Sequence, residues 1–296
     1  METFIDGFIR KFEFPEEAAE VLGISSEKIF SDKAAAELFK SIIKDYEFDM
    51  CCNFGKIWEK AEKISERITI DDFTVKLLVI IGLSDALRKY YKEKGVSENI
   101  WFDSMSDVKN KMIECKLLYG IWGTFVADWF EGFFKMRLFG MGRLQFEIKT
   151  TGRKLEIGEA VINSDENVLF VHIPRIGTKL DRTETERSYE NAARFFKPYF
   201  STGFIPFYCQ SWLLFSTTLS FLSPESNIYK FAKDYTIIEN VSYEDYSQVW
   251  RLFDRFYEGD INGLPQDTSL RKKYAEHIKS GGKFGYGTGV YLYYPK

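Results

Sequence analysis

The hydrophobic periodicity of the chain changes near residue 140, and this change limits the folds that the chain can adopt. Before this point apolar residues recur every three or four positions, as in Leu38, Phe39 and Ile42, which is the spacing of a helix face. After it, alternating or fully apolar runs take turns with helical segments, which indicates a mixed sheet flanked by helices. The sequence therefore predicts an α/β (α+β) chain with an all-helical domain, residues 1–136, and a sheet-containing domain, residues 137–296.

Local signals predict where several elements begin and end. The helix that starts at Pro15 is expected to stop at Gly23, and the next helix to use Ser31 as its N-cap. In the second domain, Thr183 and Glu186 have the spacing of a capping box. A Thr-Thr-Gly turn after residue 149 is expected to join its two flanking strands in a hairpin.

Composition excludes several classes of function. The net charge of −4 argues against nucleic-acid binding, which depends on a basic face, and the cluster with Arg143 is interpreted as a solvated surface. Only two histidines occur, His172 and His277, so no metal centre is expected. The four cysteines form no C-x-x-C pair and are expected to be reduced, in a cytoplasmic protein. Neither a secretory sequence nor a membrane span is expected.

The stretch VLFVHIPRIGTKLDRTETERSYENAARFF, residues 168–196, combines a strand, a short loop and a helix. Pro174 cannot donate to a neighbouring strand, and Gly177 permits a close backbone approach. Loop amides at a helix N-terminus favour an anion such as pyrophosphate. Acidic residues at the start of the helix oppose an anion, whereas Arg175, Lys179 and Arg182 favour it. From the residues alone, either a phosphate site or a plain connection is possible.

Several motifs occur in an order that resembles a known family. They are GRLQFE, VHIP followed by Gly177 and Leu180, SWLL, SNI before a helix, and LPQDTSL before the last helix. Together they resemble a group of two-domain bacterial N-acyltransferases with a helical N-terminal domain and a GNAT-like C-terminal domain. The resemblance covers nearly the whole chain. It implies transfer of an acyl group from acyl-CoA, as co-substrate, to an amine of a small-molecule acceptor.

The resemblance also implies a binding site for acyl-CoA. In GNAT enzymes a strand like 168–173 diverges from the next strand and binds the pantetheine arm, and the following loop binds the pyrophosphate. The implied binding residues are His172, Ile173, Arg175, Ile176, Gly177, Thr178 and Lys179. The usual loop pattern is Arg or Gln, two residues, Gly, one residue, then Gly or Ala. Here Gly177 comes one residue early, and Lys179 or Leu180 stands where a second small residue is expected.

Three residues are implied to carry the chemistry. Glu147 would accept the proton of the amine, and Tyr235, which follows Asn227 along the chain, would protonate the leaving thiolate. Two other interpretations stay open at this point: Glu147 as a surface carboxylate and Tyr235 as a core aromatic.

Two other functions stay open as well. One is a non-catalytic GNAT-like module that binds a small ligand or a partner protein. The other is a thiol hydrolase that uses Cys209 and His172, which lie on strands that are expected to be adjacent.

Overall fold

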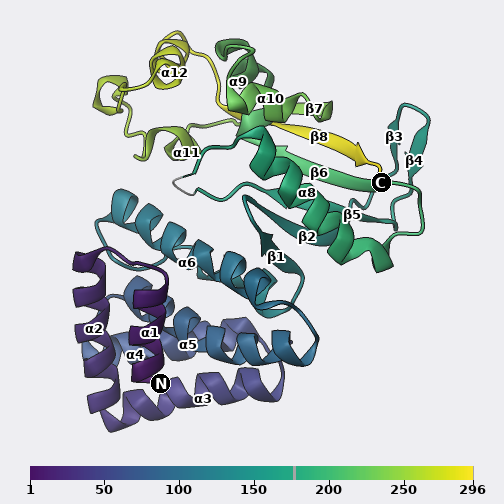
Figure 1. Ribbon diagram of the computed structural model, residues 1–296. Helices are drawn as coiled ribbons and strands as arrows, with labels where there is room; N and C mark the ends of the chain where they lie inside the picture. The colour runs from purple at the N-terminus through teal and green to yellow at the C-terminus, as the bar shows by residue number, and fades with distance from the viewer. Residues whose placement is uncertain (176–177, 296) are drawn as a thin grey trace. The chain divides into compact units, whose positions relative to one another are not determined.

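The computed structural model describes residues 1–175 and 178–295 and divides the chain into two compact units, Met1–Gly140 and Met141–Lys296 (Figure 1). The first unit is helical. Its α-helices are α1 (Glu2–Lys11), α2 (Glu16–Ser31), α3 (Lys33–Phe48), α4 (Phe54–Ile68), α5 (Asp72–Glu93), α6 (Glu98–Tyr119) and α7 (Glu131–Phe134).

Helix α5 forms the centre of the first unit. Its residues are buried on nearly every side, among them Leu78, Ile81 and Leu87, because α1, α2, α3, α4 and α6 all contact it. A helix that is apolar all round must be enclosed by other elements.

Two helix boundaries in the first unit were predicted wrongly. Helix α2 continues through Gly23 to Ser31, because one glycine costs only about 1 kcal/mol in a helix and buried Leu22 and Ile29 bind both halves to the core. The N-cap of α3 is Asp32 rather than Ser31: its carboxylate accepts the Ala35 N–H at 2.9 Å.

The main sheet has the strand order β1-β2-β5-β6-β8-β7, and all its strands except most of β1 belong to the second unit. The strands are β1 (Leu138–Met141), β2 (Leu144–Thr150), β5 (Asn167–His172), β6 (Ile205–Ser211), β7 (Thr236–Ser242) and β8 (Gly285–Tyr293). Helix α8 (Arg182–Phe196) follows β5. The shorter helices are α9 (Ser216–Phe221), α10 (Asn227–Ala232), α11 (Trp250–Phe253) and α12 (Ser269–Lys279). The predicted fold class, a helical domain followed by a mixed sheet with flanking helices, is confirmed.

The predicted hairpin after β2 was wrong. Strand β2 pairs with β5 rather than with the strand that follows it in sequence. The next two strands, β3 (Leu155–Ile157) and β4 (Ala160–Ile162), pair with each other in a separate small sheet. Leu155, Ile157 and Ile162 pack on Val168 and Tyr208 of the main sheet. The two-stranded sheet of β3 and β4 is therefore stabilised by burial against the main sheet.

Strands β5 and β6 are parallel and remain together for only a short distance. Their register consists of two pairs, Leu169 with Phe207 and Phe170 with Tyr208. Strand β6, in contrast, pairs with β8 along its full length, from Ile205 to Ser211. Beyond Phe170, therefore, β5 and β6 diverge, and one edge of each strand is open at this end.

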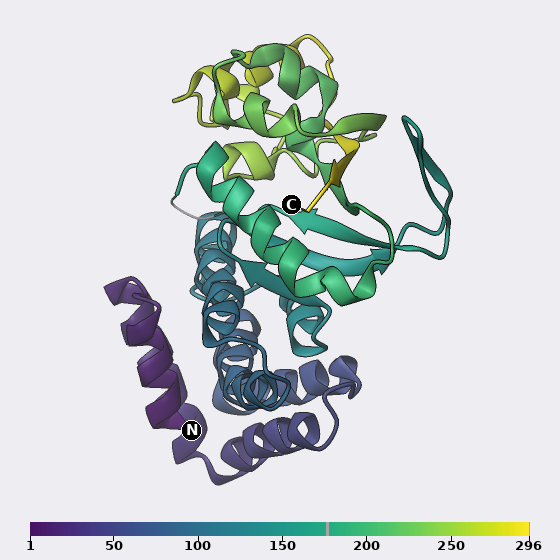
Figure 2. The same cartoon turned by 45° about the vertical axis from the view of Figure 1, so that its right-hand side comes forward.

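One face of the sheet is covered by α8 (Figure 2). The Tyr189 ring on α8 lies 4.7 Å from the Phe207 ring and 5.2 Å from the Tyr291 ring, centroid to centroid. On β8 this face carries glycines, because the backbone after β6 lies directly on the strand. A Cβ added at Gly287 would lie 2.2 Å from the carbonyl oxygen of Leu214, so only glycine fits there.

Candidate active site

The open end of β5 leads into a loop that begins at Pro174. Arg143, in the turn between β1 and β2, donates from Nη1 to the Pro174 carbonyl oxygen at 2.9 Å. Arg143 is only 7% exposed, which corrects the prediction that it belongs to a solvated surface. Its Nε has no hydrogen-bond partner among the described residues. Sequence reasoning missed this residue because nothing in its basic neighbourhood signals burial.

The loop ends at Asp181, which is the N-cap of α8 and accepts the Glu184 N–H at 3.0 Å. The predicted capping box of Thr183 and Glu186 was therefore wrong, because Thr183 lies inside the helix. The side chain of Glu186 instead accepts from Arg182 on the same helix.

The two arginines on either side of this loop are already paired with carboxylates. Arg175 forms a bidentate ion pair with Asp254, which follows α11, with the second contact at 2.9 Å. Arg182 contacts Asp234 and Glu186, each at 2.5 Å. Thr178 and Lys179, between them, are exposed, and Ile173 is half-buried. Ile176 and Gly177 lie outside the described residues.

Glu147 and His172 share the sheet face that lies opposite α8. Side chains alternate along a strand, and Glu147 is in register with Phe170, two residues before His172. The His172 Nε2 lies 3.3 Å from Glu147 Oε2, and Lys149 Nζ lies 2.8 Å from the same carboxylate. Glu147 is 5% exposed, so the interpretation as a surface carboxylate is wrong.

This environment keeps Glu147 ionised. Burial raises the pKa of a carboxyl group, but the hydrogen bonds from His172 and Lys149 outweigh it and lower the pKa of Glu147 below its ordinary value. A carboxylate bonded to one imidazole nitrogen fixes the tautomer of the ring. In the neutral ring that donates from Nε2, Nδ1 is the basic nitrogen.

Tyr235 lies on the other face of the sheet. Its hydroxyl is 2.7 Å from the Tyr189 hydroxyl, and both side chains are buried. Burial raises the pKa of Tyr235 well above its ordinary value, so its proton is held tightly. Asn227 begins α10, with Ser226 as the N-cap. Burial favours a packing role for Tyr235, and its proposed role as an acid stays a prediction.

Cys209 cannot act with His172, contrary to the thiol hydrolase interpretation. Cys209 follows Phe207 by two residues and shares its face, toward α8, whereas His172 shares the face of Phe170. Cys209 is fully buried, and burial raises the pKa of its thiol. Among the described residues, no group of three or more His, Cys, Asp or Glu side chains is arranged to hold a metal ion.

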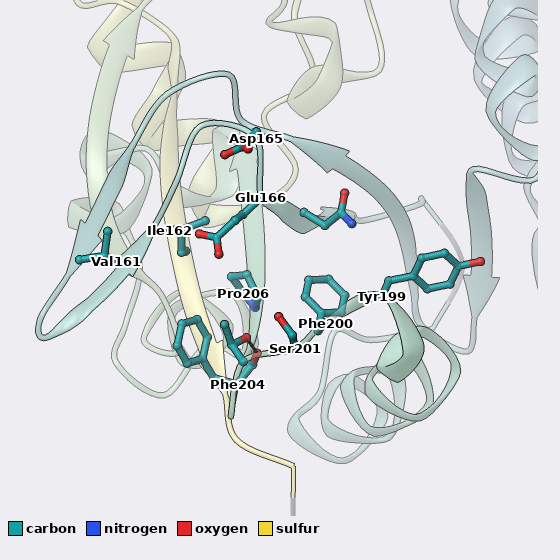
Figure 3. A pocket seen from close by; sticks show the side chains of 11 residues that line it. Val161, Ile162, Asp165, Glu166, Tyr199, Phe200, Ser201, Phe204 and Pro206 are labelled. Atoms are coloured by element: carbon teal, nitrogen blue, oxygen red, sulfur yellow. Dashed lines mark hydrogen bonds between the residues drawn. The ribbon is translucent and has the colours of Figure 1, made fainter.

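A pocket of about 170 Å³ lies at the other end of the sheet, where β5 and β6 begin (Figure 3). Glu166, Phe200 and Pro206 are among its lining residues. His172, in contrast, is the last residue of β5. This pocket is therefore separate from the predicted residues.

The structure brings the predicted residues together in two groups. The first group is Glu147 and His172, which are in contact on one face of the sheet. The second group lies in the segment that follows His172 and contains Ile173, Arg175, Thr178 and Lys179. Tyr235 and Asn227 are not in hydrogen-bond contact with either group among the contacts of the described residues. The arrangement can bind an extended chain at the open strand edge and an anion near Arg143 and α8.

These residues fit a ligand with a peptide-like arm and a phosphate group. The main chain beyond Phe170 lacks a register partner on β6, so an arm with amide groups can hydrogen-bond there. The buried Arg143 guanidinium has a donor to spare near the N-terminus of α8, which has 15 residues. Both features fit the pantetheine and pyrophosphate of acyl-CoA.

The fold and this site define a class, the GNAT-like domains. Residues 138–291 match the family model of the GNAT-like C-terminal domain, and residues 3–136 match that of the N-acyltransferase N-terminal domain. The chain belongs to the family of proteins with a GNAT-like C-terminal domain, here preceded by an N-acyltransferase N-terminal domain. No curated protein sequence matches it.

Solved acyltransferase structures share the fold at low sequence identity. One, in complex with decanoyl-CoA, has a TM-score of 0.74 at 18% identity and covers 96% of this chain and 85% of its own. A mutant acyltransferase in complex with octanoyl-CoA has a TM-score of 0.72 at 18% identity, with 96% and 86% covered. A third, in complex with decanoyl-CoA and teicoplanin, has a TM-score of 0.69 at 18% identity, with 96% and 86% covered.

Proposed function

We propose that this protein transfers an acyl group from acyl-CoA to an amine of a small-molecule acceptor. The observation that carries this proposal is the divergence of β5 and β6 after two register pairs, with a buried arginine and a helix N-terminus beyond the open end. Membership of the family and the acyl-CoA and CoA complexes of the similar structures support it. The complex of one of them with teicoplanin supports a small-molecule acceptor.

The donor would lie along the open edge of β5. Main-chain groups of Val171 and Ile173 would bind the pantetheine arm, and the segment from Pro174 to α8 would bind the pyrophosphate. Thr178 and Lys179 would bind the phosphates; Ile176 and Gly177 are assigned to the same group by the resemblance alone and lie outside the described residues. Arg175 would contribute if its pairing with Asp254 leaves Nε free to donate.

His172 is the base that the geometry supports best. Glu147 accepts from Nε2, so His172 would take the proton of the acceptor amine at Nδ1, and Glu147 would stabilise the resulting imidazolium. The amine nitrogen would then form the amide bond as the carbon–sulfur bond of the thioester breaks. The thiolate that leaves would take up a proton and become the free thiol of CoA. The proposal that Tyr235 supplies this proton requires its hydroxyl to leave Tyr189.

The proposal also includes the boundary between the two domains and the cellular compartment of the protein. We keep the division after residue 136, and the two family models, which end and begin at 136 and 138, support it. The four cysteines among the described residues are free, which supports a reducing, cytoplasmic environment. A bacterial source is proposed from the resemblance alone. Among the described residues, every helix is too short or too polar to span a membrane.

One observation favours a second candidate, a non-catalytic module that binds acyl-CoA or another small ligand. The hydroxyl of Tyr235 lies in the core, and Arg175 and Arg182 already have carboxylate partners. A protein that had lost catalysis would keep the fold and the open strand edge without a residue to protonate the thiolate.

A binding and turnover experiment tests both candidates. Acetyl-, octanoyl- and decanoyl-CoA are titrated by calorimetry and by thermal shift, where a ligand at 100 times its dissociation constant adds about 2.7 kcal/mol. Release of free CoA thiol is then followed with a panel of amines, with His172→Asn as the variant control. Thiol release that depends on both amine and His172 supports acyl transfer. Binding without release supports the module, and no binding of any thioester overturns both acyl-CoA proposals.

A further inference from the structure

Arg143 docks the turn before β2 against the first turns of α8. Its backbone N–H donates to Ser188 Oγ at 3.0 Å, and Ser188 in turn donates to the Glu184 carbonyl oxygen at 2.8 Å. Gly142, with φ of 75°, permits the turn that places Arg143 there. The guanidinium reaches Pro174 from this position, so one residue connects the helix start with the first residues of the loop.

The charge of Arg143 has no carboxylate in contact with it among the described residues. Its neighbour Asp181 attracts it at longer range, while the Asp181 carboxylate is bonded to the Glu184 N–H. Burial lowers the pKa of Arg143 to about 10, so the guanidinium is charged at neutral pH. A buried cation with an unused donor is costly unless an anion comes close to it.

The neighbouring arginines differ from Arg143 in this respect. Arg175 and Arg182 are exposed on one side, and each already contacts a carboxylate. Their positive charges are therefore largely compensated before any ligand binds. Arg143, in contrast, is buried, and no carboxylate of the described residues contacts its guanidinium.

We propose that Arg143 is a positioning residue for the donor: it fixes Pro174 at the start of the loop, and its charge offsets Asp181 so that the N-terminus of α8 accepts the phosphates of acyl-CoA. This inference rests on the proposed function and assigns a role to a residue outside the loop itself. It also explains how a loop with a displaced glycine and an acidic helix start can still accept an anion.

The test compares two donors that share the acyl-pantetheine arm and differ in the 3′-phosphoadenosine diphosphate part, which carries all the phosphates of CoA. Dissociation constants of Arg143→Met are measured for the CoA thioester that the wild-type chain binds best and for the pantetheine thioester with the same acyl group. We expect binding of the CoA thioester to weaken about tenfold or more, since a charge-assisted interaction is lost, and binding of the pantetheine thioester to change less than about threefold. Arg194→Met, in the last turn of α8, removes the same charge from an exposed site and should change neither value.

A second variant leaves Arg143 in place. Asp181→Asn keeps an N-cap residue and removes the negative charge. We expect it to tighten binding of the CoA thioester by about threefold, without effect on the pantetheine thioester, and to restore part of the loss in the Arg143→Met background. This variant keeps the proposal testable if Arg143→Met fails to fold.

Each outcome of these binding measurements either supports or overturns a proposal. A loss confined to the CoA thioester, with partial rescue by Asp181→Asn, supports the proposal. If binding of both donors weakens equally, Arg143 supports the fold of the site without acting on the phosphates. If binding of both donors is unchanged, Arg143 contributes to neither the fold of the site nor phosphate binding. Each of these results overturns the proposal. If the wild-type chain binds no CoA thioester at all, it is the proposed function that fails, which separates the two failures.

Discussion

The hydroxyl groups of Tyr189 on α8 and Tyr235 after α10 form a hydrogen bond of 2.7 Å in the core of the second unit. Neither residue is more than 6% exposed, and the Tyr235 ring packs on Phe231 and Tyr291. The bond ties α8 to the segment that leads into β7. Because each hydroxyl satisfies the other, the pair can be tested by matched single and double substitutions.

Tyr235→Phe and Tyr189→Phe should each lower the free energy of unfolding by about 1–3 kcal/mol, because each leaves a buried hydroxyl without its partner. The double variant should lose less than the sum of the two. Urea unfolding measures these differences. Equal turnover of the two single variants would leave both hydroxyls with a packing role alone, whereas slower acyl transfer by Tyr235→Phe alone would establish Tyr235 as the acid.

Glu147→Gln should lower both turnover and stability at neutral pH. We expect turnover to fall about tenfold or more, because His172 loses the carboxylate that orients its ring. The pKa of Glu147 is lowered in the folded state, so its stabilising contribution is present above the ordinary pKa of a glutamate and is lost as pH falls through the lowered value. The stability difference between wild type and variant should therefore vanish in acid.

The control for this substitution is Glu156→Gln on β3. Glu156 is exposed and pairs only with Lys154 among the contacts of the described residues. Glu156→Gln removes the same charge as Glu147→Gln, from the same unit. A turnover loss of similar size in both variants would show that the effect of Glu147 is not local to His172.

Asp254→Asn should destabilise the second unit more than Asp267→Asn. Asp254 pairs with both Arg175 and Arg271 and is 17% exposed, whereas Asp267 is 65% exposed and, within the described part of the chain, pairs with Arg271. Asn tolerates the left-handed conformation of Asp254, with φ of 58°, so the comparison isolates charge. We expect losses of about 2 kcal/mol and under about 0.5 kcal/mol in denaturant unfolding. Equal losses would mean that the contact with Arg175 adds nothing.

The order and type of the main elements could be predicted from the sequence because they depend on local periodicity. The helices of the first unit and the strand, loop and helix after Asn167 are examples. Helix ends were harder, since Ser31 and Asp32 are both good caps and only the backbone path decides between them. The partner of β2 was missed because a turn signal cannot exclude a pairing with a strand further along the chain.

The site was predicted in part for similar reasons. His172 and Glu147 could be placed on strands, but their contact depends on the register of β2 and β5. Arg143 has no local signal, because its burial results from α8 and Pro174, which lie 31 or more residues further along the chain. The core position of the Tyr235 hydroxyl likewise depends on Tyr189, 46 residues away.

The position of β8 between β6 and β7 sets the order in which the second unit can be completed. All the other strands precede β8 in sequence, so on the ribosome β7 has no neighbour in the sheet until residues 285–293 have emerged. During that interval the open edges of β6 and β7 are available to other nascent chains. Slow synthesis or truncation within this final stretch should therefore favour aggregation over a partly active product.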